Sequence, residues 1–426
     1  MQKYGYANPD EVAAAKAEPL RLNPYKMVFP NRMPYYAQRV KALVEERHGK
    51  DLLEAGGLTI ETAVSPSFDG PAMENVDFAT RLQDKRQGWR GPEWYVDGDA
   101  RTLVIERQRE RYGNRPLVAG KRYLALVENV SSGGADVRIG DNVYELPLRN
   151  MTWAAPWRAG QADNDQTIGS ATRVVKPGDM VWVAKEIRTI DRYRLWHRPD
   201  GMNPSWVPRR DERDWDANNS KYVVLEQPPH PQGAIFTADY HSGYVLASIG
   251  GSDFDRNVFD RTYQALRQPA STFKPIYYSL ALNEGYGYDT ILNDVPITIT
   301  DPVTGQTWTP NNLGDTLDGD VTLSYALVFS KNIPSVDLFT RLGADNVVNW
   351  ARRLGFTTKM FADEALALGA SSTYLDELTR AFSVFARGGT WLRNPDKSRE
   401  KDWVYVRRVL DRDGGILEDN TFAADP

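Results

Sequence analysis

Residues 267–275 read Arg267-Gln268-Pro269-Ala270-Ser271-Thr272-Phe273-Lys274-Pro275, and this stretch carries the sharpest chemical signal in the chain of 426 residues. If a helix starts near Ala270, Ser271 and Lys274 lie on one helical face, one turn from each other. A serine hydroxyl is a weak nucleophile that needs a base within hydrogen-bond reach. A lysine is such a base when burial or nearby charge lowers its pKa, because the neutral amine is required. The stretch therefore predicts a serine nucleophile with a lysine base.

Short motifs of this kind also occur by chance, and the chain contains a second Ser-x-x-Lys match at Ser398-Arg399-Glu400-Lys401. The second match lies in a charged stretch that is typical of a solvated loop. The first match is followed by an apolar run over 276–282, which predicts a buried helix able to desolvate the amine of Lys274. A position in the first helical turn also gives Ser271 unpaired amides, which favour developing negative charge.

A second polar motif, Ser330-Lys331-Asn332, stands at the break between two helices predicted over 323–329 and 335–342. Polar side chains in such a loop can point into a cleft. A serine hydroxyl there can relay a proton, and an asparagine amide can hold both a lysine and a substrate carbonyl. The alternative is that Ser330 and Asn332 only cap the ends of the two helices.

Ser-x-x-Lys followed by Ser-x-Asn resembles the transpeptidase domain of the penicillin-binding proteins, specifically the class A, bifunctional, high-molecular-weight type. The resemblance is strong over residues 231–394 and loose before them. Ala270 stands where the family usually has glycine and Ser324 where arginine is common, and neither departure removes a catalytic group. Further stretches that resemble the family are Phe259-Asp260-Arg261, Thr309-Pro310-Asn311-Asn312, Ser324-Tyr325-Ala326-Leu327, Leu368-Gly369-Ala370 and Phe385-Ala386-Arg387-Gly388-Gly389.

The resemblance implies a peptidoglycan D,D-transpeptidase or carboxypeptidase that works through a serine acyl-enzyme. Ser271 is the implied nucleophile on the D-Ala-D-Ala end of a stem peptide, with Lys274 as its base. Ser330 would help the terminal D-Ala to leave, and Asn332 would orient the donor peptide and Lys274. The implied partners are stem peptides, lipid-linked glycan strands, β-lactams as acylating inhibitors and regulators of cell-wall synthesis. The resemblance implies no cofactor and no metal.

Hydrophobic patterning predicts how the rest of the chain is organised. A helix is expected from Tyr35 to about His48, and a β-rich segment follows over 58–64. Short strand-like runs separated by turns predict a small barrel or sandwich. A hairpin and then a series of helices predict an α+β unit in the last part of the chain. The strand-like runs cover residues 123–127, 135–139 and 180–184, and the hairpin covers residues 233–249. Two further helices are expected over residues 346–354 and 375–387.

Together with the resemblance, these blocks predict a multidomain fold. Its main part is an α+β penicillin-binding transpeptidase domain of the serine β-lactamase-like type, preceded by an all-β OB-like domain and a short helical remnant. The expected units are a glycosyltransferase remnant with its linker over 1–50, a linker and the start of the transpeptidase-associated region over 51–115, an OB-like β domain with its connector over 116–220, and the transpeptidase domain over 221–426.

The family's third motif, Lys-Thr-Gly or Lys-Ser-Gly, does not occur, and the nearest triplet is Lys397-Ser398-Arg399. We expect the strand with that motif after residue 426, and a glycosyltransferase domain with a membrane anchor before residue 1. The implied location is the periplasmic, extracytoplasmic face of the bacterial inner membrane. Because that strand supplies half of the family's oxyanion hole, residues 1–426 alone are expected to be acylated slowly or not at all.

Composition excludes several other classes of protein. The balance of 52 basic and 57 acidic residues argues against a nucleic-acid binder, and the absence of cysteine excludes disulfides and thiolate chemistry. The longest apolar runs are too short to span a membrane. Asp253-x-Asp255-x-Asn257 begins like a calcium loop, but Val258 replaces the required glycine, so we expect no metal site there.

Two rival functions remain from the sequence. A serine β-lactamase or β-lactam sensor uses the same Ser-x-x-Lys motif, but those proteins are small and lack an OB-like region. The second rival is a non-catalytic scaffold of the cell-wall synthesis machinery, in which the OB-like part binds a partner or glycan.

Overall fold

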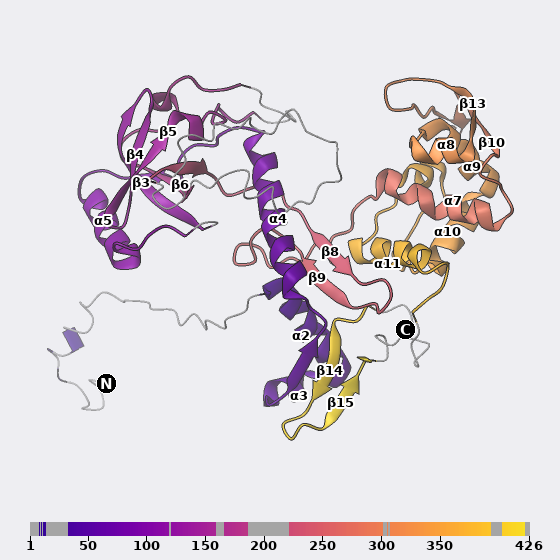
Figure 1. Ribbon diagram of the computed structural model, residues 1–426, viewed down its shortest axis with the longest axis horizontal. Helices are drawn as coiled ribbons and strands as arrows, with labels where there is room; N and C mark the ends of the chain where they lie inside the picture. Colours follow the sequence, from indigo (N-terminus) through magenta and orange to yellow (C-terminus); the bar gives the residue numbers. More distant parts are fainter. Residues whose placement is uncertain are drawn as a thin grey trace.

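The computed structural model describes residues 33–118, 121–158, 166–185, 221–300, 307–392 and 403–421, together with positions 8, 10, 12, 13 and 305. A β-rich lobe and a helical lobe lie at opposite sides of the molecule (Figure 1). Helix α4 (Pro66–Lys85) extends from the β-rich lobe to a base that contains the hairpin of β8 (Ile235–Ala238) and β9 (Val245–Ile249). The helical lobe carries the two motifs singled out in the sequence, at residues 271–274 and 330–332.

The β-rich lobe is a six-stranded antiparallel sheet in the order β2-β6-β3-β4-β5, with β7 paired to β6. Strand β4 buries Ala135, Val137 and Ile139, and the residues between them are less buried, as alternation along a strand requires. The sheet confirms the predicted all-β domain. Its strands are β2 (Trp94–Tyr95), β3 (Arg122–Ser131), β4 (Gly134–Ile139), β5 (Asn142–Pro147), β6 (Asp179–Lys185) and β7 (Val223–Glu226).

The helical lobe is built around α7 (Lys274–Asn283), whose residues Ile276, Tyr277 and Ala281 are almost completely buried. The apolar run that follows Lys274 therefore forms a core helix, as its composition predicted. Around it pack α8 (Leu323–Val328), α9 (Asn332–Leu342), α10 (Ala344–Arg353), α11 (Leu375–Ala386) and the antiparallel pair of β10 (Ile291–Asp294) and β13 (Gly319–Thr322). The pair β11 (Ile299–Thr300) and β12 (Thr307–Trp308) lies beside them.

The base joins segments that are far apart in the chain. Strand β1 (Thr59–Thr62) pairs with β14 (Val406–Leu410), which pairs in turn with β15 (Ile416–Asp419). The hairpin of β8 (Ile235–Ala238) and β9 (Val245–Ile249) lies beside this sheet (Figure 1). The Tyr36 hydroxyl of α2 (Pro34–His48) donates to the carbonyls of Val245 and Tyr405, at 2.9 and 3.0 Å, and so links the helix to both parts.

The stretch 51–115 holds helices that the sequence patterns did not predict: α4, α5 (Gly98–Tyr112) and the short α3 (Lys50–Ala55). Helix α4 contains Gly70 and Pro71, a pair that normally marks a break, and α5 buries only Gln108 fully. The buried face of α4 includes Asp69, Thr80 and Asp84, so an apolar periodicity does not mark either helix. The second Ser-x-x-Lys match at 398–401 and the connector over 186–220 lie outside the described residues.

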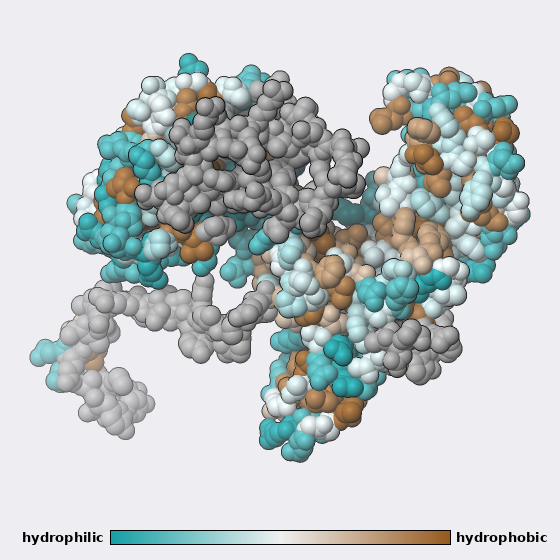
Figure 2. Space-filling model, viewed as in Figure 1, coloured by the Kyte–Doolittle hydropathy of each residue, from teal (hydrophilic) through white to brown (hydrophobic). Residues whose placement is uncertain are grey.

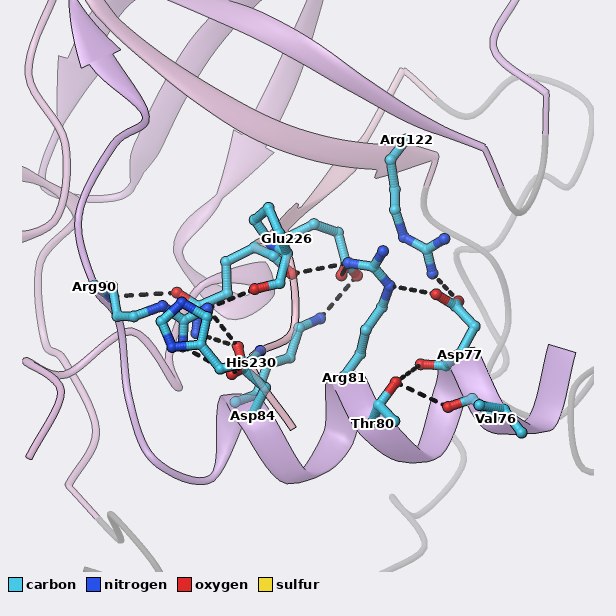
Figure 3. A network of polar contacts seen from close by, with 12 residues as sticks. Val76, Asp77, Thr80, Arg81, Asp84, Arg90, Arg122, Glu226 and His230 are labelled. Atoms are coloured by element: carbon cyan, nitrogen blue, oxygen red, sulfur yellow. Dashed lines mark hydrogen bonds and ion pairs between the residues drawn. The ribbon is translucent and has the colours of Figure 1, made fainter. Parts of the chain in front are cut away.

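One face of α4 carries charged side chains that bind the β-rich lobe (Figure 3). Asp77 pairs with Arg122 of β3, and Lys85 Nζ lies 2.8 Å from Glu226 Oε1 of β7. Arg81 links these two ion pairs, because its Nε lies 2.8 Å from Asp77 Oδ1 and its Nη1 lies 3.5 Å from Glu226 Oε2. Burial raises the pKa of Glu226, but Lys85 and Arg81 outweigh burial and the pKa is lowered.

Asp84 is the most buried member of this network. It is 0 % exposed, and its two oxygens accept from Nη1 and Nη2 of Arg90 at 2.7 and 2.8 Å. The Gln227 amide and the His230 backbone N–H also donate to Asp84, at 2.8 and 3.0 Å. At the other end of α4, Ala72 and Val76 pack against β9. The helix thus connects the β-rich lobe to the base.

Replacing Asp84 by alanine is expected to destabilise this junction by about 3–5 kcal/mol, because it leaves the partly buried Arg90 without its counter-ion. The melting temperature measured by calorimetry should fall by roughly 10 °C. Asp99→Ala, in the first turn of α5 and exposed, is the matched control and should change little. Equal melting temperatures for the two variants would contradict the prediction.

Candidate active site

Ser271 lies in a 3-10 turn, Ala270–Phe273, that leads directly into α7. The α-helix proper begins at Lys274, four residues later than the sequence indicated, and Pro275 occupies its first turn. The Ser271 side chain is exposed, whereas Phe273 is buried and anchors the turn in the core. The turn therefore presents a hydroxyl at the surface on a backbone fixed from beneath.

Ala270 adopts φ 48°, a left-handed conformation that costs a residue with a Cβ about 1–2 kcal/mol. The penicillin-binding proteins that the motif resembles usually have glycine at this position, and glycine adopts such a φ without strain. Gly369 packs against the same residue, and a Cβ at Gly369 would lie 2.3 Å from the Ala270 carbonyl oxygen. The turn before Ser271 is thus held by a close backbone contact.

Lys274 is buried, with 1 % of its surface exposed, and its Nζ contacts four oxygen atoms. It donates to the Ser330 carbonyl at 2.8 Å, the Lys331 carbonyl at 3.1 Å and Asn332 Oδ1 at 2.8 Å. The Ser330 hydroxyl lies 3.2 Å away. The structure therefore brings Lys274, Ser330 and Asn332 together from two separate motifs.

Burial lowers the pKa of Lys274 from 10.5 to about 8. The four oxygens that contact Nζ belong to neutral groups, so none of them holds the proton as a carboxylate would. At neutral pH an appreciable fraction of the amine is consequently unprotonated, which is the state a general base requires.

The loop that carries Ser330 and Asn332 has an unusual backbone. Ser330 adopts φ 52°, and its carbonyl and hydroxyl both reach Lys274. Asn332 is the first residue of α9, and its Nδ2 donates to the Asn311 carbonyl at 2.8 Å, which leaves Oδ1 for the lysine. Both residues do more than cap helix ends, since their side chains contact the buried amine.

Ser271 and Lys274 both belong to the described residues, and no hydrogen bond joins the Ser271 hydroxyl to the Lys274 amine.

Sequence reasoning assigned no role to three further residues that contact the 330–332 loop or one another: Asp294, Asn312 and Lys331. Asn312 belongs to a stretch that the resemblance singled out, but Asp294 and the middle residue of Ser-x-Asn carried no signal.

A cleft of about 510 Å³ lies next to the turn that carries Ser271 and is lined in part by Gln268, Pro269 and Thr272. Basic side chains of Arg261, Arg267 and His230 line its wall. The helical lobe also exposes apolar side chains, and brown patches mark this face in Figure 2. Those closest in sequence to Ser330 are Val328 and Phe329, which are 76 % and 61 % exposed.

Within the part of the chain that the structure describes, no three metal-ligating side chains gather at one point. In the calcium-like stretch, Asp253 Oδ1 accepts from the backbone N–H groups of Asp255 and Arg256. The carboxylate therefore stabilises its own loop. No described helix is both long and apolar enough to cross a lipid bilayer.

Comparison with known protein families gives two matches. Residues 233–390 match the penicillin binding protein transpeptidase domain, and residues 89–201 match the penicillin-binding protein OB-like domain. The chain belongs to the penicillin-binding proteins, and this pair of domains in this order is that of the class A type. The resemblance drawn from the two motifs and the predicted fold class are thereby confirmed.

Two curated relatives carry the same name. Penicillin-binding protein 1A of Pseudomonas aeruginosa is 27% identical over 422 residues, which are 98% of this chain and 45% of the relative. Penicillin-binding protein 1A of Neisseria gonorrhoeae is 29% identical over 384 residues, 90% of this chain and 42% of the relative. The chain thus spans about half the length of these curated relatives.

A solved structure has the same fold over nearly the whole chain. The crystal structure of penicillin-binding protein 1A from Haemophilus influenzae superposes with a TM-score of 0.70 at 25% sequence identity. The match covers 98% of this chain and 54% of that structure. The similarity therefore includes the arrangement of the lobes as well as the transpeptidase domain.

Proposed function

We propose that this chain carries the D,D-transpeptidase centre of a bifunctional peptidoglycan synthase, with Ser271 as nucleophile and Lys274 as base. One observation carries the proposal: a buried lysine amine with a pKa of about 8, whose hydrogen-bond partners among the described residues are neutral oxygens, lies one helical turn from an exposed serine. The transpeptidase domain match and the relatives named penicillin-binding protein 1A support the same reaction class.

In the first half-reaction, the Ser271 oxygen attacks the carbonyl carbon of the penultimate D-Ala while its proton passes to neutral Lys274. Catalytic hydrogen bonds often tighten only when substrate binds, so the open serine–lysine geometry is compatible with this step. We assign the stabilisation of the negative oxygen to the backbone N–H of Ser271, which lies in the turn before α7. The carbon–nitrogen bond then breaks, and the leaving D-Ala amine takes the proton from Lys274 through the Ser330 hydroxyl.

In the second half-reaction, an amine from a neighbouring stem peptide attacks the acyl-enzyme carbonyl and gives its proton to Lys274. The Ser271 oxygen leaves and recovers that proton, which restores the free enzyme with no net change in charge. Water in place of the amine gives carboxypeptidase activity. Asn332 holds Lys274 through Oδ1, and we assign it the additional role of orienting the donor peptide.

The substrates and surroundings follow from the same proposal. Stem peptides and lipid-linked glycan strands are the substrates of the whole protein, and β-lactams acylate Ser271 as inhibitors. The whole protein acts at the periplasmic face of the inner membrane, together with regulators of cell-wall synthesis. Neither half-reaction calls for a cofactor or a nucleic-acid partner.

The site of acylation tests the proposal. The full-length protein that contains this chain is incubated with a fluorescent penicillin, digested, and analysed by mass spectrometry. One penicilloyl group is expected on the peptide that contains Ser271. A label on another residue, or no covalent label at all, would refute the assignment, and the second outcome would favour the non-catalytic scaffold.

A further inference from the structure

Asp294, the last residue of β10, is a fully buried carboxylate next to the Ser330–Asn332 loop. Its Oδ1 accepts from Asn312 Nδ2 at 2.6 Å, and its Oδ2 accepts from the Asp318 backbone N–H at 3.0 Å. Lys331 Nζ lies 3.3 Å from the same Oδ2. A buried carboxylate is costly unless such partners satisfy it, so its presence calls for an explanation.

The carboxylate determines which way the Asn312 amide faces. An ionised carboxylate only accepts hydrogen bonds, so the NH2 group of Asn312 must point at Asp294. The same NH2 group donates to the Thr316 carbonyl at 2.8 Å. The amide oxygen of Asn312 consequently faces the start of α9, where it accepts from the backbone N–H groups of Asn332 at 2.8 Å and Ile333 at 3.2 Å.

This contact fixes the residue that holds Lys274. With its backbone N–H bound to Asn312 and its Nδ2 bound to the Asn311 carbonyl, Asn332 has Oδ1 left for Lys274 Nζ, at 2.8 Å. A continuous series of hydrogen bonds therefore runs from Asp294 through Asn312 and Asn332 to Lys274. The side-chain amides of Asn312 and Asn332 each have one orientation that makes the hydrogen bonds on both sides of the residue.

The ion pairs of Lys331 hold the same loop from the side away from the amine. Its Nζ lies 2.5 Å from Asp318 Oδ2 as well as 3.3 Å from Asp294, and its side chain is only 10% exposed. Its carbonyl accepts from Lys274. The middle residue of Ser-x-Asn thus fastens the loop to the β10–β13 pair while its backbone contacts the proposed base.

We propose that Asp294 is a positioning residue for the transpeptidase reaction, which orients Asn332, and through it the Lys274 amine, by way of Asn312. The inference rests on the proposed function of Ser271 and Lys274. Asp294 does not touch the substrate; it sets the direction of the hydrogen bonds that aim the amine.

The test is acylation kinetics with a fluorescent penicillin, which separate the binding constant from the acylation rate constant. In Asp294→Asn, an amide replaces the carboxylate, and the NH2 groups of residues 294 and 312 compete for one position. The acylation rate constant is expected to fall about ten- to a hundredfold, as small misplacements of reacting groups do, with the binding constant within about threefold of wild type. Asp320→Asn, on the exposed face of β13, is the matched control.

A swap variant keeps the test independent of folding. In Asp294→Asn with Asn312→Asp, the amide of residue 294 donates to the carboxylate of residue 312, which still accepts from the α9 amides, while the Thr316 carbonyl loses its donor. The acylation rate constant is therefore expected to recover in part, to at least about threefold above that of Asp294→Asn. The inference would be overturned if Asp294→Asn left the acylation rate constant unchanged. It would also be overturned if the swap variant regained the wild-type melting temperature but its acylation rate constant did not recover. All variants are made in the full-length protein, and full-length wild type that is not acylated at all would refute the proposed function instead.

Discussion

Ser271→Ala is expected to leave the full-length protein with no covalent penicillin label under conditions that label the wild type completely. In the proposed mechanism the Ser271 oxygen itself forms the acyl-enzyme bond, so its removal leaves nothing for the penicillin to acylate. The change removes one exposed oxygen that has no hydrogen bond to Lys274 in the described structure, so stability should change by less than about 0.5 kcal/mol. In-gel fluorescence after labelling measures the first effect and calorimetry the second.

The neighbouring hydroxyl provides the control for this prediction. Thr272 is exposed, lies in the same turn and lines the adjacent cleft. Thr272→Ala should retain labelling because its hydroxyl takes no part in the reaction. Residual labelling of Ser271→Ala at the wild-type rate would show that the nucleophile lies elsewhere.

Lys274→Met is expected to slow acylation by about 10²- to 10⁴-fold, the range that a positioned general base contributes. Methionine fills nearly the same volume but cannot accept the Ser271 proton. The pH dependence separates this cause from misfolding. In the wild type the rate should rise with pH and level off near the Lys274 pKa of about 8, whereas the variant should show no such rise.

Stability gives a second, independent measure of the same group. Folding lowers the pKa of Lys274 from 10.5 to about 8. Below pH 8 the lysine is protonated in both the folded and the unfolded protein, so the full cost of burying its charge is subtracted from the free energy of unfolding. Between about pH 8 and 10.5 the unfolded chain binds the extra proton, so this cost is relieved as pH rises. The wild type should therefore gain stability relative to Lys274→Met over that range. A constant difference in free energy of unfolding would show that the lysine pKa is not lowered.

The pairing of Ser271 with a buried lysine at the start of α7 could be predicted, because it depends only on residues that are close together in the sequence. A polar Ser-x-x-Lys followed by seven mostly apolar residues indicates a buried helix with an amine at its start, and the structure has this helix. The loop at Ser330 was predictable as a break between helices. The 3-10 geometry of the turn was not, because it depends on the contact between Ala270 and Gly369, about a hundred residues apart in the chain.

Long-range polar contacts explain what the sequence did not reveal. Asp294 lies 18 residues from Asn312, and neither stands in a pattern that marks burial. The same holds for α4, whose charged face looks like a solvated surface until β3 and β7 are placed against it. Charged residues that become buried through partners distant in sequence cannot be recognised from periodicity alone.

The hydrogen bonds of Lys274 have a consequence for how the site responds to losing a proton. An ammonium group has three N–H bonds to share among four oxygens, and the neutral amine has only two. Three of those oxygens are carbonyl or amide oxygens that cannot donate in return; the Ser330 hydroxyl can rotate and donate to the amine. In the proposed mechanism, each proton transfer to or from Lys274 is therefore accompanied by a reversal of its hydrogen bond with Ser330. The hold of the 330–332 loop on the amine then weakens when Lys274 is neutral and strengthens when it is protonated.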